Sequence, residues 1–186
     1  SMSLIRCLGR ITLPLAYRRY LRDEVEHFKR IRKKFGSSDW AQEFLTKPGD
    51  AGHDYHNKQV RYIGDDVVMV VKPQRCPTLE AVLAEFGQGR QQHCCMTLVE
   101  TMLHADDAID VKEISLFIPY QVSPCHYLRV KDEEMQLLPG RIYAFNQRRE
   151  HKLHYRSEYG SWGGSKPCSA LSVCFERKHP ANRNRY

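Results

Sequence analysis

Apolar positions follow two different spacings along this chain, and the change between them separates a helical start from a strand-rich remainder. In the start, apolar side chains recur every three or four residues and Gly36 follows the last of them; they are Tyr17, Leu21, Val25, Phe28, Ile31 and Phe35. This spacing places them along one face of an α-helix, and glycine is common just beyond a helix end. We therefore predict an amphipathic helix within residues 1–36.

Four further segments are predicted before the strand-rich part. "SSDWAQEFL" predicts a short helix capped by Ser38 or Asp39, and "KPGDAGHDYHNKQ" predicts a loop. "VRYIGDDVVMVVKP" predicts a β-hairpin, because a Gly-Asp-Asp turn joins two β-branched runs and Pro73 ends the second. "PTLEAVLAEFG" predicts an interior helix with Thr78 as its N-cap and Gly87 just after its end.

From residue 93 onward, short apolar runs alternate with turn residues. The predicted strands are "CCMTLVETML", "KEISLFIPYQV", "HYLRVK", "EMQLLP", "RIYAFN", "KLHYRS" and "SALSVCFER". Short strands with turns every 8 to 12 residues or so are typical of a sandwich, a jelly roll or a small barrel. With 186 residues and 41% apolar content, we expect one domain with a β-rich body at 60–178 and a loose basic tail at 179–186.

Charge is concentrated at the start of the chain. Residues 1–35 hold ten Lys or Arg against three acidic residues, and the remaining 19 basic and 19 acidic residues balance, so the whole net charge of +7 lies in the helical arm. One interpretation is a helix packed on the body with solvated cations. The other is an electrostatic footprint for nucleic acid or an acidic protein.

Cysteine usage and hydropathy bear on the compartment. The seven cysteines are an odd number at irregular spacing, and no segment has the pattern of a signal peptide, so we expect reduced thiols in a cytoplasmic protein. No apolar run approaches the roughly 18 to 20 residues that a membrane span requires.

The histidines are the candidate chemistry. A non-haem Fe(II) site of the facial-triad type uses two imidazoles and one carboxylate. One His-x-Asp triplet exists, His104-Ala105-Asp106, at the end of an apolar run, and His151 opens a later predicted strand. In that strand the period of two groups His151 with Leu153 and Tyr155, so His151 is expected to face inward and His154 to face solvent.

The segment "LLPGRIYAFNQRREHKLHYRSEYGSWGGSKPCSALSVCFER" resembles the second half of the double-stranded β-helix of Fe(II)- and 2-oxoglutarate-dependent dioxygenases, especially the prolyl-hydroxylase-like branch. In that family, a glycine begins a strand that ends in an aromatic residue. The distal histidine comes about eleven residues after the glycine, and a basic residue precedes the final strand. Gly140, Phe145, His151, Lys166 and "ALSVCF" occur here in that order.

The resemblance implies an α+β domain: a double-stranded β-helix (jelly roll) with an N-terminal basic helical layer. It implies Fe(II) bound by His104, Asp106 and His151, 2-oxoglutarate held by Lys166, and hydroxylation or oxidative demethylation of a substrate. In the family the anchor is usually Arg with Ser or Thr two residues later, whereas Cys168 follows Lys166 here. Because "EYGSWGGS" lengthens the spacing, Arg156 or His154 stays an alternative.

Two other interpretations remain open. The same scaffold could serve as a non-catalytic binding or inhibitory module that contacts nucleic acid or a protein through its basic N-terminal helix. Alternatively, a hydrolase or other metalloenzyme could use His53, Asp54 and His56, although a glycine-flanked loop holds ligands less rigidly than a strand does. The run His93-Cys94-Cys95 has no second pair to complete a zinc site.

Overall fold

The computed structural model describes residues 3–35, 61–63, 66–86, 91–101, 103–105, 113–156 and 166–175. These segments contain two α-helices, α1 (Leu15–Phe35) and α4 (Pro77–Phe86). They also contain ten strands: β1 (Arg6–Arg10), β2 (Arg61–Ile63), β3 (Asp66–Val71), β4 (Gln91–Leu98), β5 (Ile114–Gln121), β6 (His126–Val130), β7 (Glu133–Gln136), β8 (Arg141–Asn146), β9 (His151–Tyr155) and β10 (Cys168–Phe175).

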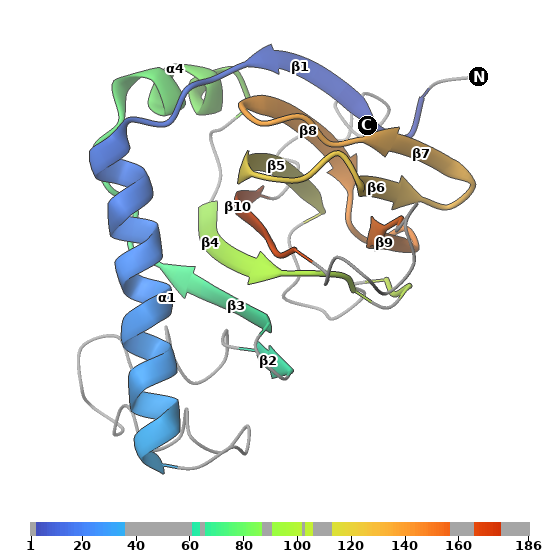
Figure 1. The fold of residues 1–186 in the computed structure, drawn as a ribbon. Helices are drawn as coiled ribbons and strands as arrows, with labels where there is room; N and C mark the ends of the chain where they lie inside the picture. Colours follow the sequence, from blue (N-terminus) through green and yellow to red (C-terminus); the bar gives the residue numbers. More distant parts are fainter. Residues whose placement is uncertain are drawn as a thin grey trace.

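The strands form two sheets whose order reveals the fold (Figure 1). The larger sheet has the order β1-β8-β5-β10-β4-β3-β2 and the smaller has β7-β6-β9. From β5 on, the chain passes to the small sheet for β6 and β7, back for β8, across again for β9 and back for β10. This winding of antiparallel strands between two facing sheets is a double-stranded β-helix, the jelly-roll architecture. The predicted fold class is confirmed, with the N-terminal helix in place.

Two apolar cores show how the layers are stacked. One joins the helices to the large sheet and includes Leu21 of α1 and Leu79 of α4. The other fills the space between the two sheets and includes Phe117, Leu128 and Leu153. The layer order is therefore helices, large sheet and small sheet, so α1 lies on the opposite side of the molecule from β6, β7 and β9 (Figure 1).

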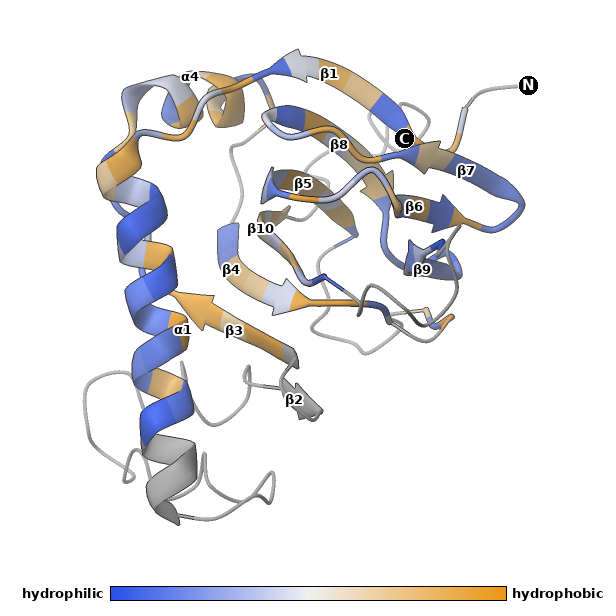
Figure 2. Cartoon of the chain, viewed as in Figure 1, coloured by the Kyte–Doolittle hydropathy of each residue, from blue (hydrophilic) through white to orange (hydrophobic). Residues whose placement is uncertain are grey.

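The strand predicted over "RIYAFN" is β8, and its side chains alternate between the two cores. Ile142 and Ala144 pack in the helix-side core, whereas Tyr143 and Phe145 pack between the sheets. The helical pattern holds too, because Tyr17, Leu21, Val25 and Phe28 are all buried; they are the apolar stripe of an α1 that is otherwise largely hydrophilic (Figure 2).

Only a helix was predicted within residues 1–36, but the structure also has the strand β1 there. β1 pairs with β8 and shifts register between Cys7 and Arg10, where Gly9 has a φ of 122° that glycine adopts readily. "RCLGR" carries no apolar alternation, so long-range pairing with β8 and not local propensity makes it a strand.

Two predicted boundaries were wrong. α4 begins at Pro77, and the Cys76 carbonyl accepts the Glu80 N–H at 2.9 Å, so Thr78 lies inside the first turn and is not the N-cap. Proline suits this first helical position because its missing N–H would have no helical partner there. The strand expected over "CCMTLVETML" runs instead from Gln91 to Leu98.

Several predicted features lie outside the described residues: the short helix after Ser38, the loop with His53, Asp54 and His56, the C-terminal tail and Asp106. The hairpin of β2 and β3 is present, although Asp66, which was predicted to lie in the turn, is the first residue of β3. All seven cysteines fall in described segments and none forms a disulfide. Neither described helix has an apolar stretch long enough to cross a bilayer.

Candidate metal centre

His104 and His151 meet at the margin of the small sheet. They form an isolated antiparallel bridge, in which His104 N–H donates to the His151 carbonyl at 3.1 Å and His151 N–H donates to the His104 carbonyl at 2.8 Å. Residues directly opposite each other in an antiparallel pair project their side chains to the same face. Accordingly, the two imidazole ring centroids lie 4.3 Å apart.

His151 faces the space between the sheets, as the alternation predicted. It pairs with Val130 of β6, which is fully buried between the sheets, and is itself 7% exposed. Its ring lies 5.1 Å from the ring of Phe145, which belongs to the large sheet. The histidine pair therefore lies at the rim of the inter-sheet core, with an aromatic ring next to it.

The hydrogen bond of the His151 side chain sets its protonation form. Nδ1 lies 2.7 Å from the Arg149 carbonyl oxygen, which can only accept, so Nδ1 carries the hydrogen. In the neutral ring, Nε2 then bears the lone pair that a metal ion requires. Fixing one ring nitrogen by a backbone carbonyl is the usual way in which a metal-binding histidine is oriented. His151 is therefore held with Nε2 available, as a metal-binding histidine is.

His154 lies on the other face of β9. Its Nδ1 is 3.0 Å from a Glu100 carboxylate oxygen, and its side chain is 30% exposed. It was predicted to face solvent, and the structure confirms the face of the strand but leaves the side chain only partly exposed beside Glu100. His154 therefore takes no part in the histidine pair.

The third predicted ligand, Asp106, lies outside the described residues. Among the residues that the structure describes, no group of three or more His, Cys, Asp or Glu side chains gathers in a metal-binding arrangement. The ligand set His104, Asp106 and His151 accordingly stays a prediction, of which the structure brings the two histidines together.

Lys166 is exposed and lies two residues before β10 begins. The alternative anchor, Arg156, is engaged elsewhere: it donates to Glu134 at 2.8 Å and its guanidinium carbon lies 4.4 Å from the centroid of the Tyr127 ring. The first residue of β10 is Cys168, which is fully buried in the inter-sheet core, and burial raises the pKa of its thiol to about 12. The anchoring role of Lys166 stays a prediction.

The inner face of the large sheet carries a polar row that we did not identify in the sequence. Ser115 and Ser172 share a 2.8 Å hydrogen bond, Cys174 lies 3.4 Å from Ser172, and the Cys174 thiol donates to Gln147 at 3.6 Å. Ser115 is directly opposite Phe145 in the sheet, one strand from the ring that adjoins His151. The sequence could have indicated this row, because the period of two in "EISLF" and "ALSVCF" places Ser115, Ser172 and Cys174 on the sheet face that also carries Phe117.

A further buried imidazole lies at the end of β6. His126 is fully buried, and its Nδ1 accepts hydrogen bonds from the Ser123 N–H at 3.1 Å and from the Ser123 hydroxyl at 2.9 Å. Burial lowers the pKa of His126, and nearby backbone groups of Ser123, Val99 and Lys166 oppose this effect. Because His126 pairs with Tyr155 at the far end of β9 from His151, it is not part of the histidine pair.

The chain is similar to solved structures only at low sequence identity. No family model and no curated protein sequence matches the chain. A prolyl-4-hydroxylase from Pseudomonas putida is similar in structure, with 12% identity, a TM-score of 0.48, and coverage of 95% of this chain and 94% of that chain.

Two other solved structures show the same kind of likeness. A full-length Neurospora crassa protein in complex with alpha-KG and thymine has 11% identity and a TM-score of 0.47, covering 94% of this chain and 76% of that chain. A 2OG-Fe(II) oxygenase family oxidoreductase from Burkholderia pseudomallei has 10% identity and a TM-score of 0.40, and the match covers 65% of this chain and 76% of that chain. At these identities and TM-scores the likeness adds nothing to the strand order, which by itself defines the double-stranded β-helix.

Proposed function

We propose that this chain is an Fe(II)- and 2-oxoglutarate-dependent oxygenase that carries out hydroxylation or oxidative demethylation. Its iron ligands are His104, Asp106 and His151, and Lys166 holds the carboxylate of 2-oxoglutarate. The observation that carries the proposal is the histidine pair, with ring centroids 4.3 Å apart at the rim of the core of a double-stranded β-helix. The residues from 137 to 177 add the family resemblance.

The chain's own contribution is to position the metal ligands and to exclude water. The backbone bridge fixes the spacing of His104 and His151, and the Arg149 carbonyl holds the His151 ring in the form that binds through Nε2. The buried Phe145 ring and the inter-sheet core keep bulk water from one side of the pair. Iron, when bound, would supply the oxygen chemistry. Since all seven cysteines are free thiols, we place the activity in the cytoplasm.

Metal titration tests the ligand set directly. Co(II), which substitutes for Fe(II) and absorbs visible light in protein sites, is titrated into wild type and into His104→Ala, Asp106→Ala and His151→Ala. Each variant should weaken Co(II) binding more than about 100-fold, since loss of even an indirect partner of a ligand costs about 10- to 100-fold. His154→Ala is the matched control, because this histidine lies on the opposite face of the same strand, and it should bind Co(II) as wild type does.

Turnover tests the reaction. Under oxygen, with ascorbate as the two-electron donor in place of the unidentified substrate, the Fe(II)-loaded wild type should convert 2-oxoglutarate to succinate and CO2. Lys166→Ala should raise the apparent requirement for 2-oxoglutarate far more than it weakens metal binding. Arg156→Ala is the control for the anchor because Arg156 is paired with Glu134. Tight metal binding without any succinate would refute the oxygenase while keeping the metal site.

The alternative that we also propose is a binding module for nucleic acid or an acidic protein through α1. The supporting observation is that Arg19, Arg22 and Arg30 are exposed on a helix whose other side is buried. Replacing these three residues with Glu should abolish retention on heparin and on single-stranded DNA without unfolding the protein. Retention that survives the triple variant and does not respond to salt would refute this module.

A further inference from the structure

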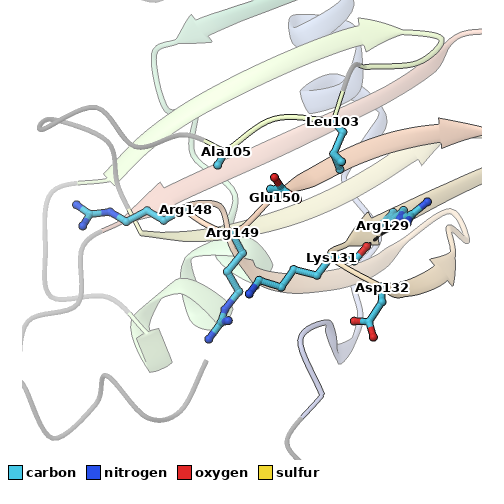
Figure 3. Close-up of a pocket in the computed structure, with 8 residues that line it drawn as sticks. All are labelled: Leu103, Ala105, Arg129, Lys131, Asp132, Arg148, Arg149 and Glu150. Atoms are coloured by element: carbon cyan, nitrogen blue, oxygen red, sulfur yellow. Dashed lines mark hydrogen bonds between the residues drawn. The ribbon is translucent and has the colours of Figure 1, made fainter.

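An open groove of about 590 Å³ lies on the outer surface, behind the histidine pair. Two turns and one short segment form it: the turn between β6 and β7, the turn between β8 and β9, and residues 103–105 (Figure 3). Its lining residues are Leu103, Ala105, Arg129, Lys131, Asp132, Arg148, Arg149 and Glu150. The volume is that of a site for a small molecule.

The groove is distinct from the metal centre. Arg129 precedes Val130 and Glu150 precedes His151, and adjacent residues along a strand project to opposite faces. Val130 and His151 point between the sheets, so Arg129 and Glu150 belong to the outer side. The same holds for Leu103 and Ala105, which flank His104. A molecule in the groove would therefore lie on the other side of the backbone bridge from the two imidazoles.

The groove carries more positive than negative charge, and some of its cations form no ion pair with a carboxylate. Four cations line it against two carboxylates. Arg129 donates through Nε to the Lys131 carbonyl at 2.8 Å, and Arg148 lies 3.7 Å from Glu113. Among the described residues, Lys131 and Arg149 take part in no ion pair. In Figure 3 the Lys131 side chain extends across the groove toward Arg149, so two like charges converge without a carboxylate between them.

The backbone of Lys131 supplies an independent sign that its position matters. With a φ of 54°, it is the one described residue other than glycine that has a positive φ. It opens the two-residue turn between Val130 and Glu133, where glycine or asparagine is the usual choice. Its N–H donates to the Glu150 carbonyl at 2.8 Å, which ties the two turns together. Lys131 thus has a backbone conformation that is uncommon for lysine. Residues in such conformations cluster at functional sites.

We propose that this groove binds a small molecule that carries a phosphate monoester and an adjoining apolar group. A phosphate monoester carries close to two negative charges at neutral pH, which matches the two uncommitted cations, and its oxygens accept from both a guanidinium and an ammonium. Leu103, 47% exposed, gives the groove an apolar wall for the rest of the molecule. This binding goes beyond the proposed oxygenase activity and requires no metal.

Phenyl phosphate is the probe, because it joins a phosphate monoester to an apolar ring. Its binding to the metal-free protein is measured by isothermal titration calorimetry at low salt. We expect Lys131→Asn and Arg149→Gln each to weaken binding by at least about tenfold, the usual scale for a lost charged hydrogen bond. Asparagine tolerates the positive φ, so Lys131→Asn removes the charge and preserves the turn. Lys72→Asn is the matched control, because this exposed lysine just after β3 is not among the residues that line the groove, and the variant should bind as wild type does.

Further measurements test the apolar contact, the charge of the ligand and the size of the ligand separately. Leu103→Ser should weaken phenyl phosphate but leave inorganic phosphate unchanged, since only the former has an apolar group to contact it. Binding of benzoate as tight as that of phenyl phosphate would refute recognition of a dianion. A single-stranded ten-nucleotide DNA that binds more than tenfold tighter than phenyl phosphate, and loses that affinity in Lys131→Asn, would refute the small-molecule ligand. Equal binding by wild type and both charge variants would refute the site.

Discussion

His104 and His151 exchange both of their backbone hydrogen bonds, although 47 residues of sequence separate them. Their ring spacing therefore depends on main-chain pairing and not on the loops that leave β4 and precede β9. Replacing either side chain should leave the bridge intact, because the atoms that form it are common to all residues except proline. The pair can thus be altered chemically without moving its backbone.

Metal binding should appear as a gain in stability. A ligand that binds only the folded state at 100 times its dissociation constant stabilises it by about 2.7 kcal/mol. We expect Co(II) to raise the melting temperature of wild type and of His154→Ala, but not that of His104→Ala or His151→Ala. The measurement is differential scanning calorimetry with and without the metal. Equal stabilisation of all four proteins would place the metal elsewhere.

Stability should fall as the solution is made acidic. Burial lowers the pKa of both His126 and His93 below the usual value of 6.5, so between pH 6.5 and these lower values the unfolded chain binds protons that the folded chain does not. The stabilisation is therefore complete above about pH 6.5 and is lost as pH falls through the folded pKa values. Urea midpoints across pH 5 to 7.5 measure it. His126→Gln should make the dependence shallower.

The exposed and the buried cysteine thiols should react with an alkylating reagent at different rates. Burial raises the pKa of Cys95 and of Cys168 to about 12, and both side chains are fully buried, whereas Cys7 is exposed. Because the thiolate is the reactive form, iodoacetamide at pH 8 should alkylate Cys7 and spare Cys95 and Cys168 in the native protein. Peptide mass spectrometry gives the sites, and urea should expose all seven. Alkylation of Cys168 as fast as Cys7 would mean that the inter-sheet core opens readily.

The attachment of α1 should depend on its buried stripe. Leu21 is fully buried against the large sheet, so Leu21→Ala should lower the free energy of unfolding by about 2 to 5 kcal/mol. Leu15→Ala makes the same chemical change on the same helix at a side chain that is 53% exposed, and should cost less than about 0.5 kcal/mol. Urea denaturation compares the two. Similar small losses would show that α1 contributes little to the fold.

Alternation and spacing predicted the parts of the fold that local sequence encodes. The helix spacing identified α1, and the period of two correctly divided β8 between two cores and turned His151 inward. Both predictions succeed because a helix or strand that is buried on one side has apolar residues at the period of that element, and this period can be read in the sequence. The histidine pair followed from the family resemblance and from this parity together.

Features created by distant pairing left no such trace. β1 has two arginines and a glycine in five residues and becomes a strand because β8 offers an edge. The groove arises where two turns meet, and nothing in the sequence near Lys131 predicts that Arg149 lies across from it. The sequence also gives no sign that Cys168, two residues after the exposed Lys166, is buried in the inter-sheet core.

β1 also protects the sheet to which it belongs. It occupies the end of the large sheet beside β8, Ile5 just before it is buried in the inter-sheet core, and the Leu4 N–H donates to Glu133 of β7. Without these first residues, β8 would present a row of unsatisfied N–H and C=O groups, the kind of exposed edge through which β-proteins pair with one another and aggregate. β1 is then the edge strand, but it is five residues long, shifts register near Gly9 and carries Arg6 and Arg10, all of which oppose pairing with another chain. A variant that lacks residues 1–12 should therefore aggregate at a lower concentration than the chain that carries them.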